Sequence, residues 1–138
     1  MKVIGIEIKS NEAIVVVLEK DATGNIVQSV ESTKIGIADS ASNNQVRQFM
    51  QQVKASLDNI NADEIAILAR NGKAKGIMAP SPFAFKLEGL FQLYDKKDVQ
   101  FVWPQTVSAF LKKKGCPLSS EKKYQEDAFR LAYYLLNK

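Results

Sequence analysis

Glu7 is the residue whose sequence surroundings are most informative about chemistry. It interrupts the apolar segment Val-Ile-Gly-Ile-Glu-Ile at residues 3–8. A carboxylate in such a segment is costly if it is buried without a partner. Two interpretations stay open: Glu7 is a strand-end carboxylate that is exposed to water or paired with a lysine, or it belongs to a metal or phosphate site.

Residues 70–82 form a basic segment that contains glycines. Its cations are Arg70, Lys73 and Lys75, and Lys86 follows nearby. Glycines let backbone N–H groups turn inward, so such a loop is able to cradle a phosphate or a nucleic-acid backbone. The spacing is not that of a P-loop, and a solvated surface loop is the alternative interpretation.

The sequence contains no histidine and one cysteine, Cys116. These counts exclude Ser-His-Asp and Cys-His catalysis, histidine acid–base chemistry and the common zinc sites. Any bound metal is therefore expected to be hard and oxygen-bound, such as Mg²⁺ or Mn²⁺. A lone cysteine cannot form an internal disulfide, which fits a reducing compartment.

The composition is that of a single globular domain over residues 1–138, with 46% apolar and 25% charged residues. The net charge of +4 permits an anionic partner such as nucleic acid without requiring one. Glu7 interrupts what would be the apolar part of a secretory signal, and no apolar run approaches the roughly 20 residues that span a membrane. We therefore expect a cytoplasmic protein with no membrane partner.

The first third of the chain predicts an antiparallel meander. Strands are expected at residues 3–8, 13–18 and 26–37, with turn residues between them. The unbroken β-branched run in the second strand indicates burial on both faces. An amphipathic helix should follow, capped at its start by Ser42 or Asn43.

The rest of the chain alternates helix and strand. Further strands are expected at residues 64–69 and 99–103, the second with Phe101 and Trp103 in the core. The expected helix starts are Ser81-Pro82, Pro104, and Ser119 or Ser120, with the last helix running to about Leu136.

This order predicts an α/β fold with a five-stranded mixed sheet and helices on both faces. Crossover handedness favours a fourth strand that runs parallel to the first. Open α/β sheets bind ligands beyond the carboxyl ends of strands, where the strand order reverses. The candidate site therefore lies at Glu7–Lys9 and at Arg70-Asn71 with the loop that follows.

The element order and two short motifs resemble the ribonuclease H-like superfamily, especially the compact branch that includes bacterial Holliday-junction resolvases. Gly5-Ile6-Glu7 is similar to the Gly-Ile-Asp motif of the first strand in that branch. Glu126-Asp127-Ala128 is similar to the acidic Asp-Ala pattern of the final helix. The fourth strand departs from the branch because it ends in Ala69-Arg70, where an acid is usual. The chain also resembles a family of short bacterial domains of this fold without an assigned function.

The resemblance implies a metal-dependent nuclease that acts on nucleic acid with Mg²⁺ or Mn²⁺. It implies catalytic roles for Glu7, Asp127 and Glu126, and metal ligation by Glu7 and Asp127. Glu88, in the neighbouring helix, is the candidate metal ligand that would substitute for the missing acid of the fourth strand. The implied phosphate-binding residues are Lys9, Arg70, Lys73, Lys75 and Lys86. The fourth strand lacks its usual acid, and Arg70 would repel a cation held near it. The missing acid favours an alternative: a catalytically inactive domain for binding or dimerisation. The resemblance leaves a homodimer open.

Overall fold

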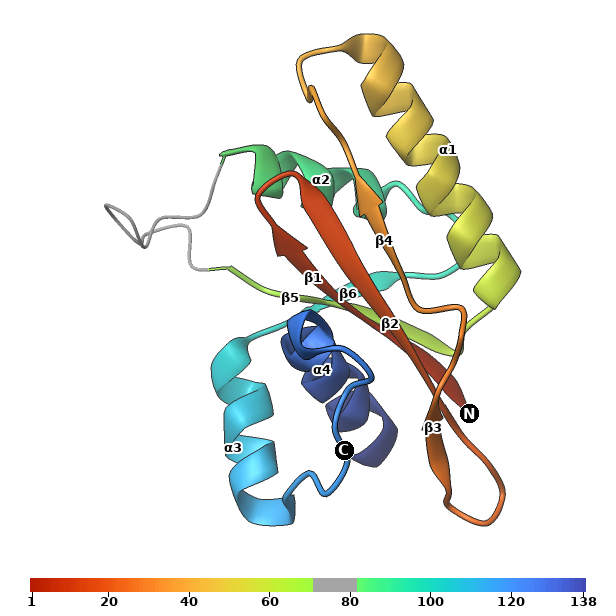
Figure 1. Ribbon diagram of the computed structural model, residues 1–138, viewed down its shortest axis with the longest axis vertical. Coiled ribbons are helices and arrows are strands. Elements are labelled where there is room, and N and C mark those ends of the chain that lie inside the picture. The colour runs from red at the N-terminus through yellow and green to blue at the C-terminus, as the bar shows by residue number, and fades with distance from the viewer. Residues whose placement is uncertain (71–81) are drawn as a thin grey trace.

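The computed structural model describes residues 1–70 and 82–138 (Figure 1). In this part of the chain six strands form one mixed sheet in the order β3-β2-β1-β5-β6, and β4 also pairs with β2. The strands are β1 (Lys2–Lys9), β2 (Glu12–Lys20), β3 (Ile26–Gln28), β4 (Thr33–Gly36), β5 (Glu64–Leu68) and β6 (Val99–Val102). The helices are α1 (Asn43–Ile60), α2 (Pro82–Gln92), α3 (Pro104–Lys114) and α4 (Glu126–Asn137), and a 3₁₀ turn at Lys123–Gln125 leads into α4.

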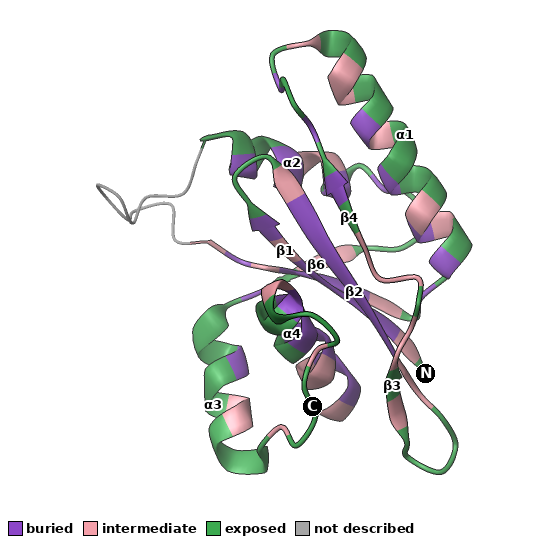
Figure 2. Ribbon diagram, viewed as in Figure 1, coloured by how far each residue is buried: buried purple, intermediate pink, exposed green. Residues whose placement is uncertain are grey.

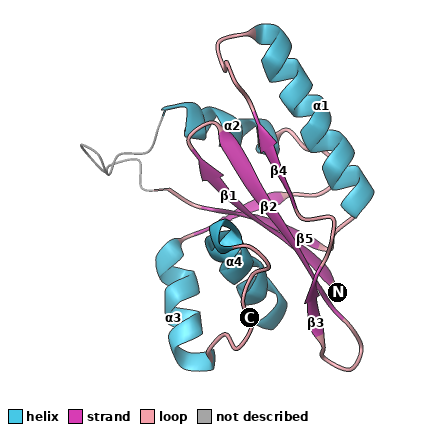
Figure 3. Ribbon diagram, viewed as in Figure 1, coloured by secondary structure: helices cyan, strands magenta, loops and turns pink. Residues whose placement is uncertain are grey.

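The predicted α/β fold is confirmed, with its antiparallel meander followed by parallel strands. β1 pairs with β2 in antiparallel fashion and with β5 in parallel fashion, so the expected junction between the first and fourth predicted strands is present. Helices cover both faces of the sheet: α1 and α2 lie on one side, α3 and α4 on the other (Figure 3). β2 is buried along most of its length on both faces, as predicted (Figure 2).

The predicted third strand is divided in two, which raises the strand count of the described residues from five to six. Its break lies at residues 29–32, where Val30 and Glu31 form a turn. The backbone N–H of Ser29 still donates to the Val17 carbonyl at 2.8 Å. The Ser32 hydroxyl then accepts from the Val17 N–H at 2.9 Å, in place of a backbone carbonyl. A side-chain hydrogen bond thus satisfies the Val17 N–H where the third predicted strand leaves the sheet.

Two hydrophobic clusters fill the space between the sheet and its helices. One joins β1 and β5 side chains to α1 and α2 and includes Ile6, Phe49 and Phe91. The other lies beneath α4 and includes Val16 and Leu131. Both clusters use alternate residues of the same central strands, as the two-residue period of a strand requires.

The two predicted aromatic core residues of the fifth strand are not in the core. Phe101 is 38% exposed and Trp103 is 53% exposed. The reason is the place of β6 at the end of the strand order, where it has a described neighbour on one side only. Apolar composition alone therefore gave a wrong prediction for an edge strand.

The helix starts are partly as predicted. Ser42 caps α1, since its hydroxyl accepts from the Gln45 N–H at 3.3 Å, and α3 begins at Pro104. The last helix, however, is not capped by Ser119 or Ser120: the Ser120 hydroxyl instead donates to the Lys122 carbonyl. None of the described helices is long and apolar enough to span a membrane.

The start of α4 is fixed by a buried glutamine instead. The side-chain oxygen of Gln125 accepts from Gln28 Nε2 at 2.9 Å and from the Lys122 N–H at 3.1 Å. This interaction connects β3 to the 3₁₀ turn. It leaves Glu126 and Asp127 in the first turn of α4, where negative charge is favoured by the helix dipole.

Gly5 sets the distance between β1 and α4. A Cβ atom added to Gly5 would lie 2.3 Å from the Ala128 carbonyl oxygen and 2.8 Å from the Ala132 nitrogen. Because both contacts are with helix backbone, the clash cannot be relieved by turning a side chain. A glycine is therefore required for α4 to pack directly on β1.

Replacing Gly5 by alanine should lower the free energy of unfolding by about 3 kcal/mol, because the helix has to move away from the strand. Urea denaturation measures this change. Gly89→Ala is the matched control, since a Cβ there has open space in the middle of α2; it should be neutral or stabilising by up to about 1 kcal/mol. Equal effects of the two substitutions would contradict the proposed role of Gly5.

Candidate active site

The candidate site lies where the carboxyl ends of β1 and β5 meet the first turn of α4. The parallel register pairs Ile6 with Ile67, so the two strands end side by side. Glu7 follows Gly5 by two residues and therefore points to the same face of the sheet. That face is covered by α4, whose Ala128 contacts Gly5 and whose Asp127 directly precedes it. The structure thus brings Glu7 and Asp127 together from opposite ends of the chain.

The Glu7 carboxylate is poorly solvated. Its side chain is 13% exposed, and its buried Oε1 atom has no hydrogen-bond partner, although Lys9 Nζ lies 3.7 Å away. The pKa of Glu7 is raised to about 7, chiefly by burial and also by the charge of Asp127 and a hydrogen bond with it, against the opposing charges of Lys9 and Arg70. A proton or a cation between these two carboxyl groups would reduce their repulsion.

Arg70 follows β5 and is half-buried at the same edge of the sheet. Its positive charge interacts with Glu88 of α2 and with Glu7 of β1. Burial lowers the pKa of Arg70 and the two carboxylates raise it. Glu88 is only 6% exposed, and burial raises the pKa of its carboxyl group while Arg70 lowers it. The charge of Arg70 therefore acts on one acid from each face of the sheet.

Unsatisfied polar atoms concentrate at this edge of the sheet. In residues 1–70 and 82–138, the buried side-chain atoms without a hydrogen-bond partner are Glu7 Oε1, Arg70 Nε and Glu88 Oε2. Each such atom costs about 1–3 kcal/mol unless something else satisfies it. All three belong to one electrostatically linked cluster. A polar or charged ligand would satisfy them, which identifies the cluster as the candidate site.

The predicted site residues divide into those at the cluster and those away from it. Lys9 lies beside Glu7. Glu126 lines a hollow together with Lys9 and Asp127, but its carboxylate forms an exposed ion pair with Arg130 at 2.6 Å. Lys86 donates to the Ser40 carbonyl at 2.6 Å and so connects α2 to the segment before α1. The predicted phosphate contacts Lys73 and Lys75 lie outside the described residues.

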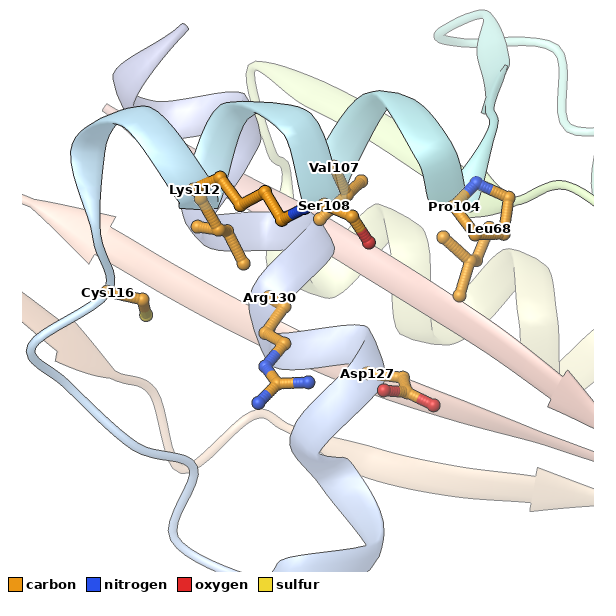
Figure 4. Close-up of a pocket in the computed structure, with 9 residues that line it drawn as sticks. Leu68, Pro104, Val107, Ser108, Lys112, Cys116, Asp127 and Arg130 are labelled. Carbon is orange, nitrogen blue, oxygen red and sulfur yellow. The ribbon is translucent and has the colours of Figure 1, made fainter.

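Two hollows flank Asp127. The first, about 440 Å³, lies between α3 and α4 beyond the end of β5 (Figure 4). Its wall is formed by Leu68, Pro104, Val107, Ser108, Leu111, Lys112, Cys116, Asp127 and Arg130. The second, about 550 Å³, is lined by Lys9, Lys123, Tyr124, Glu126 and Asp127. Asp127 therefore lines both a hollow of mixed polar and apolar character and one whose cations are Lys9 and Lys123.

Lys123 and Tyr124 were not predicted as site residues. The signal was present in the sequence, because the pair Lys122-Lys123 stands just before the two acids of α4. Lys34 adds a further cation, with its Nζ 4.2 Å from the centre of the Tyr124 ring. What the sequence did not indicate was that the 3₁₀ turn presents Lys123 beside Lys9.

The donor set fits one hard cation better than two. Glu7 and Asp127 supply adjacent carboxylates, one with an unsatisfied oxygen. Within the described residues, no three acidic or cysteine side chains group closely enough to hold a metal ion. Glu88 interacts with Arg70 instead, so it does not complete a three-ligand set with the other two acids there. The metal and catalytic roles of these residues stay predictions.

Solved structures with the same fold include Holliday junction resolvases. Thermus thermophilus RuvC in complex with a Holliday junction substrate is 14% identical, with a TM-score of 0.69 over 99% of this chain and 97% of that chain. Another Thermus thermophilus RuvC structure is 13% identical, with a TM-score of 0.72 over 96% of this chain and 91% of that chain. The fowlpox virus resolvase in complex with Holliday junction DNA is 16% identical, with a TM-score of 0.54 over the whole of both chains.

At these identities the likeness shows the fold alone, which is the ribonuclease H-like fold of the resolvases, as predicted. No curated protein is significantly similar to the chain in sequence. A family model described as "Protein of unknown function (DUF3010)" matches residues 1–135. The chain therefore belongs to the DUF3010 family, a family of unknown function with a resolvase-like fold.

Proposed function

We propose that this chain is a metal-dependent nuclease that binds nucleic acid at the edge of the sheet where Glu7 meets Asp127. The observation that carries the proposal is the pairing of these carboxylates, one with an unsatisfied buried oxygen, beside a lysine-bearing hollow. An acid pair of this kind is stabilised by a positive charge. A phosphodiester backbone is in turn attracted to the lysines that surround the pair.

Glu7 and Asp127 would hold one Mg²⁺ or Mn²⁺ through their oxygens, the ligands that these ions prefer. When bound, such a cation activates water and stabilises the charge that develops on a phosphodiester during cleavage. Glu7 reaches the site from a rigid strand and Asp127 from the first turn of a helix. Both backbones are fixed by the contact at Gly5, so the two carboxylates are positioned before any ligand arrives.

Lys9 and Lys123 are the phosphate contacts best supported by the described geometry, because both line the hollow that contains Asp127. Lys73 and Lys75 are retained as contacts on the sequence evidence. The resolvases of the same fold were solved with Holliday junction substrates, which makes branched DNA the first substrate to test. A homodimer stays part of this proposal because a branched substrate presents two strands for cleavage.

Arg70 supports a second candidate function, a catalytically inactive domain that binds nucleic acid or a second copy of itself. The residue lies just beyond the end of β5 at Leu68, and no third acid joins Glu7 and Asp127 among the described residues. Cleavage that relies on two metal ions needs more carboxylates than this edge offers. The two candidates differ in whether a nucleic acid that binds is also cut.

Cleavage of nucleic acid distinguishes the two candidates. The protein is incubated with branched, double-stranded and single-stranded DNA and RNA in the presence of Mg²⁺ or Mn²⁺. We expect cleavage that falls by about 100-fold or more in Glu7→Gln, since the variant loses charge where the transition state needs it. Gel analysis of the products measures the effect, and binding by the same variant is measured in parallel.

Glu19→Gln is the matched control for this experiment. It also removes one acid from a strand, but Glu19 pairs with Lys2 away from the site, so cleavage should be unchanged. Equal cleavage by the wild type and Glu7→Gln would mean that a contaminating nuclease is responsible. Binding without cleavage by the wild type would favour the inactive candidate.

The acid pair should also make stability depend on pH. The Glu7 pKa is raised from 4.5 to about 7 in the folded protein, so its stabilising contribution is complete below pH 4.5 and is lost as the pH rises through 7. The loss amounts to about 3 kcal/mol at roughly 1.4 kcal/mol per unit. Urea denaturation of the metal-free protein at pH 5 and pH 8 should show this decrease in the wild type.

Glu7→Gln isolates the contribution of this carboxyl group, because glutamine carries no charge at either pH. Relative to the wild type, the variant should gain about 3 kcal/mol of stability between pH 5 and pH 8. Added Mg²⁺ at pH 8 should stabilise the wild type and leave the variant unchanged. Parallel pH profiles of the two proteins would refute the coupling of Glu7 to its surroundings.

A further inference from the structure

Cations line both of the hollows that share Asp127. The α3 hollow, of about 440 Å³ between α3 and α4, contains Lys112 and Arg130. The Lys9 hollow, of about 550 Å³, contains Lys9 and Lys123. Asp127 forms part of the wall of each, so positive charges lie on both sides of one carboxylate. A polyanion that passes Asp127 is therefore able to contact both sets of cations.

Lys112 and Lys123 are the cations of these hollows that are left for a ligand. Both residues are exposed. The other cation of each hollow already has an acidic neighbour, which is Glu126 in the α3 hollow and Glu7 in the Lys9 hollow. Among residues 1–70 and 82–138, neither Lys112 nor Lys123 forms an ion pair. Each ammonium group is therefore available to a phosphate, one on either side of Asp127.

The α3 hollow has the size and the lining of a site for a nucleobase. Its volume lies in the range of roughly 300–1,000 Å³ that is common for small organic ligands. Val107 and Ser108 line it from α3, and Asp127 lines it from α4 (Figure 4). The apolar part of the wall offers a surface to the face of a base, and the Ser108 hydroxyl is able to hydrogen-bond its edge.

A paired base does not fit these requirements. In a duplex the faces of a base are covered by stacking and its edge is occupied by its partner, so only an unpaired or extruded base enters a pocket. Proteins that bind single strands combine cations for the backbone with surfaces for the bases. The α3 hollow and the two lysines provide both in one place.

We propose that the two hollows together bind one single-stranded segment of nucleic acid. Its backbone passes Asp127, one unpaired base lies in the α3 hollow, and phosphates lie beside Lys112 and Lys123. The inference rests on the proposed function for the class of ligand, which is nucleic acid. It goes further by naming the form that is bound at the acid pair, an unpaired strand, and the path that the strand takes.

Ser108→Trp tests whether a base occupies the α3 hollow, because the indole ring fills that space from an exposed helix position. Fluorescence anisotropy is measured without divalent ions, using a labelled oligothymidylate of about 12 nucleotides and a GC-rich duplex of about 12 base pairs. We expect the wild type to bind the single strand at least tenfold more tightly than the duplex, and Ser108→Trp to lose this preference. Ala109→Trp is the matched control, since Ala109 is exposed on α3 and does not line the hollow.

The salt dependence of single-strand binding tests the two phosphate contacts. Lys112→Gln and Lys123→Gln should each reduce the slope of log affinity against log salt concentration by about 0.7, the value for one phosphate of a single strand. Lys97→Gln removes the same charge just before β6, at the opposite end of the parallel strands, and should leave the slope unchanged.

Asp127→Asn tests the path of the strand. The variant removes a negative charge that repels the passing phosphates in the absence of a divalent ion, so single-strand affinity should rise at least threefold. Asp98→Asn is the control, because Asp98 is exposed beside Lys97 and away from both hollows. Circular dichroism and urea denaturation verify that every variant is folded.

Equal wild-type affinity for the single strand and the duplex would overturn the proposal, as would an unchanged preference in Ser108→Trp or no binding of the single strand at all. These titrations contain no divalent ion and therefore do not depend on cleavage. Single-strand binding by a protein that cuts nothing in Mg²⁺ would count against the nuclease and leave this inference standing. Cleavage of branched DNA by a protein that does not bind single strands would do the reverse.

Discussion

The backbone contact between β1 and α4 at Gly5 is the constraint on which the rest of the site depends. Helices usually pack on sheets through a layer of side chains, yet here a carbonyl oxygen of Ala128 occupies the space of a missing Cβ. This short separation brings the first turn of α4 to the end of β1. Two acids that are 120 positions apart in the sequence, Glu7 and Asp127, become neighbours as a result.

Burial and charge pairing have opposite effects on the carboxyl groups at this edge of the sheet. Burial disfavours the ionised forms of Glu7 and Glu88, while Arg70 favours them. Neither burial nor the charge of Arg70 gives the unsatisfied atoms a hydrogen-bond partner. Stability and ligand binding are thus in competition here, as is common where a protein keeps polar groups ready for a partner. The hydrophobic clusters on both faces of the sheet supply stability that the unsatisfied polar groups of the site do not.

The fold could be predicted from the sequence because local patterns agreed with each other. The meander, the crossover helices and the pairing of β1 with β5 followed from periodicity and connection rules. The position of Glu7 at a strand end was also visible. Exposure of Phe101 and Trp103 was not, because a strand's place at the edge of a sheet is a property of the assembled sheet.

The candidate site could be predicted less completely than the fold. Gly5-Ile6-Glu7 and the acids of α4 indicated which residues to examine. The interaction of Arg70 with Glu88 depends on how α2 lies against the end of β5, and no spacing in the sequence encodes that geometry. The buried Gln125 that fixes the start of α4 was likewise missed, because its partner Gln28 lies 97 residues away.

The side chain of Asp127 forms part of the wall of both hollows. A compact molecule is able to fill one of them without meeting the other. An elongated molecule that occupies both has to pass this carboxylate, with one portion against the α3 wall and the other beside Lys9 and Lys123. The length of a bound molecule therefore decides whether it meets one set of cations or both.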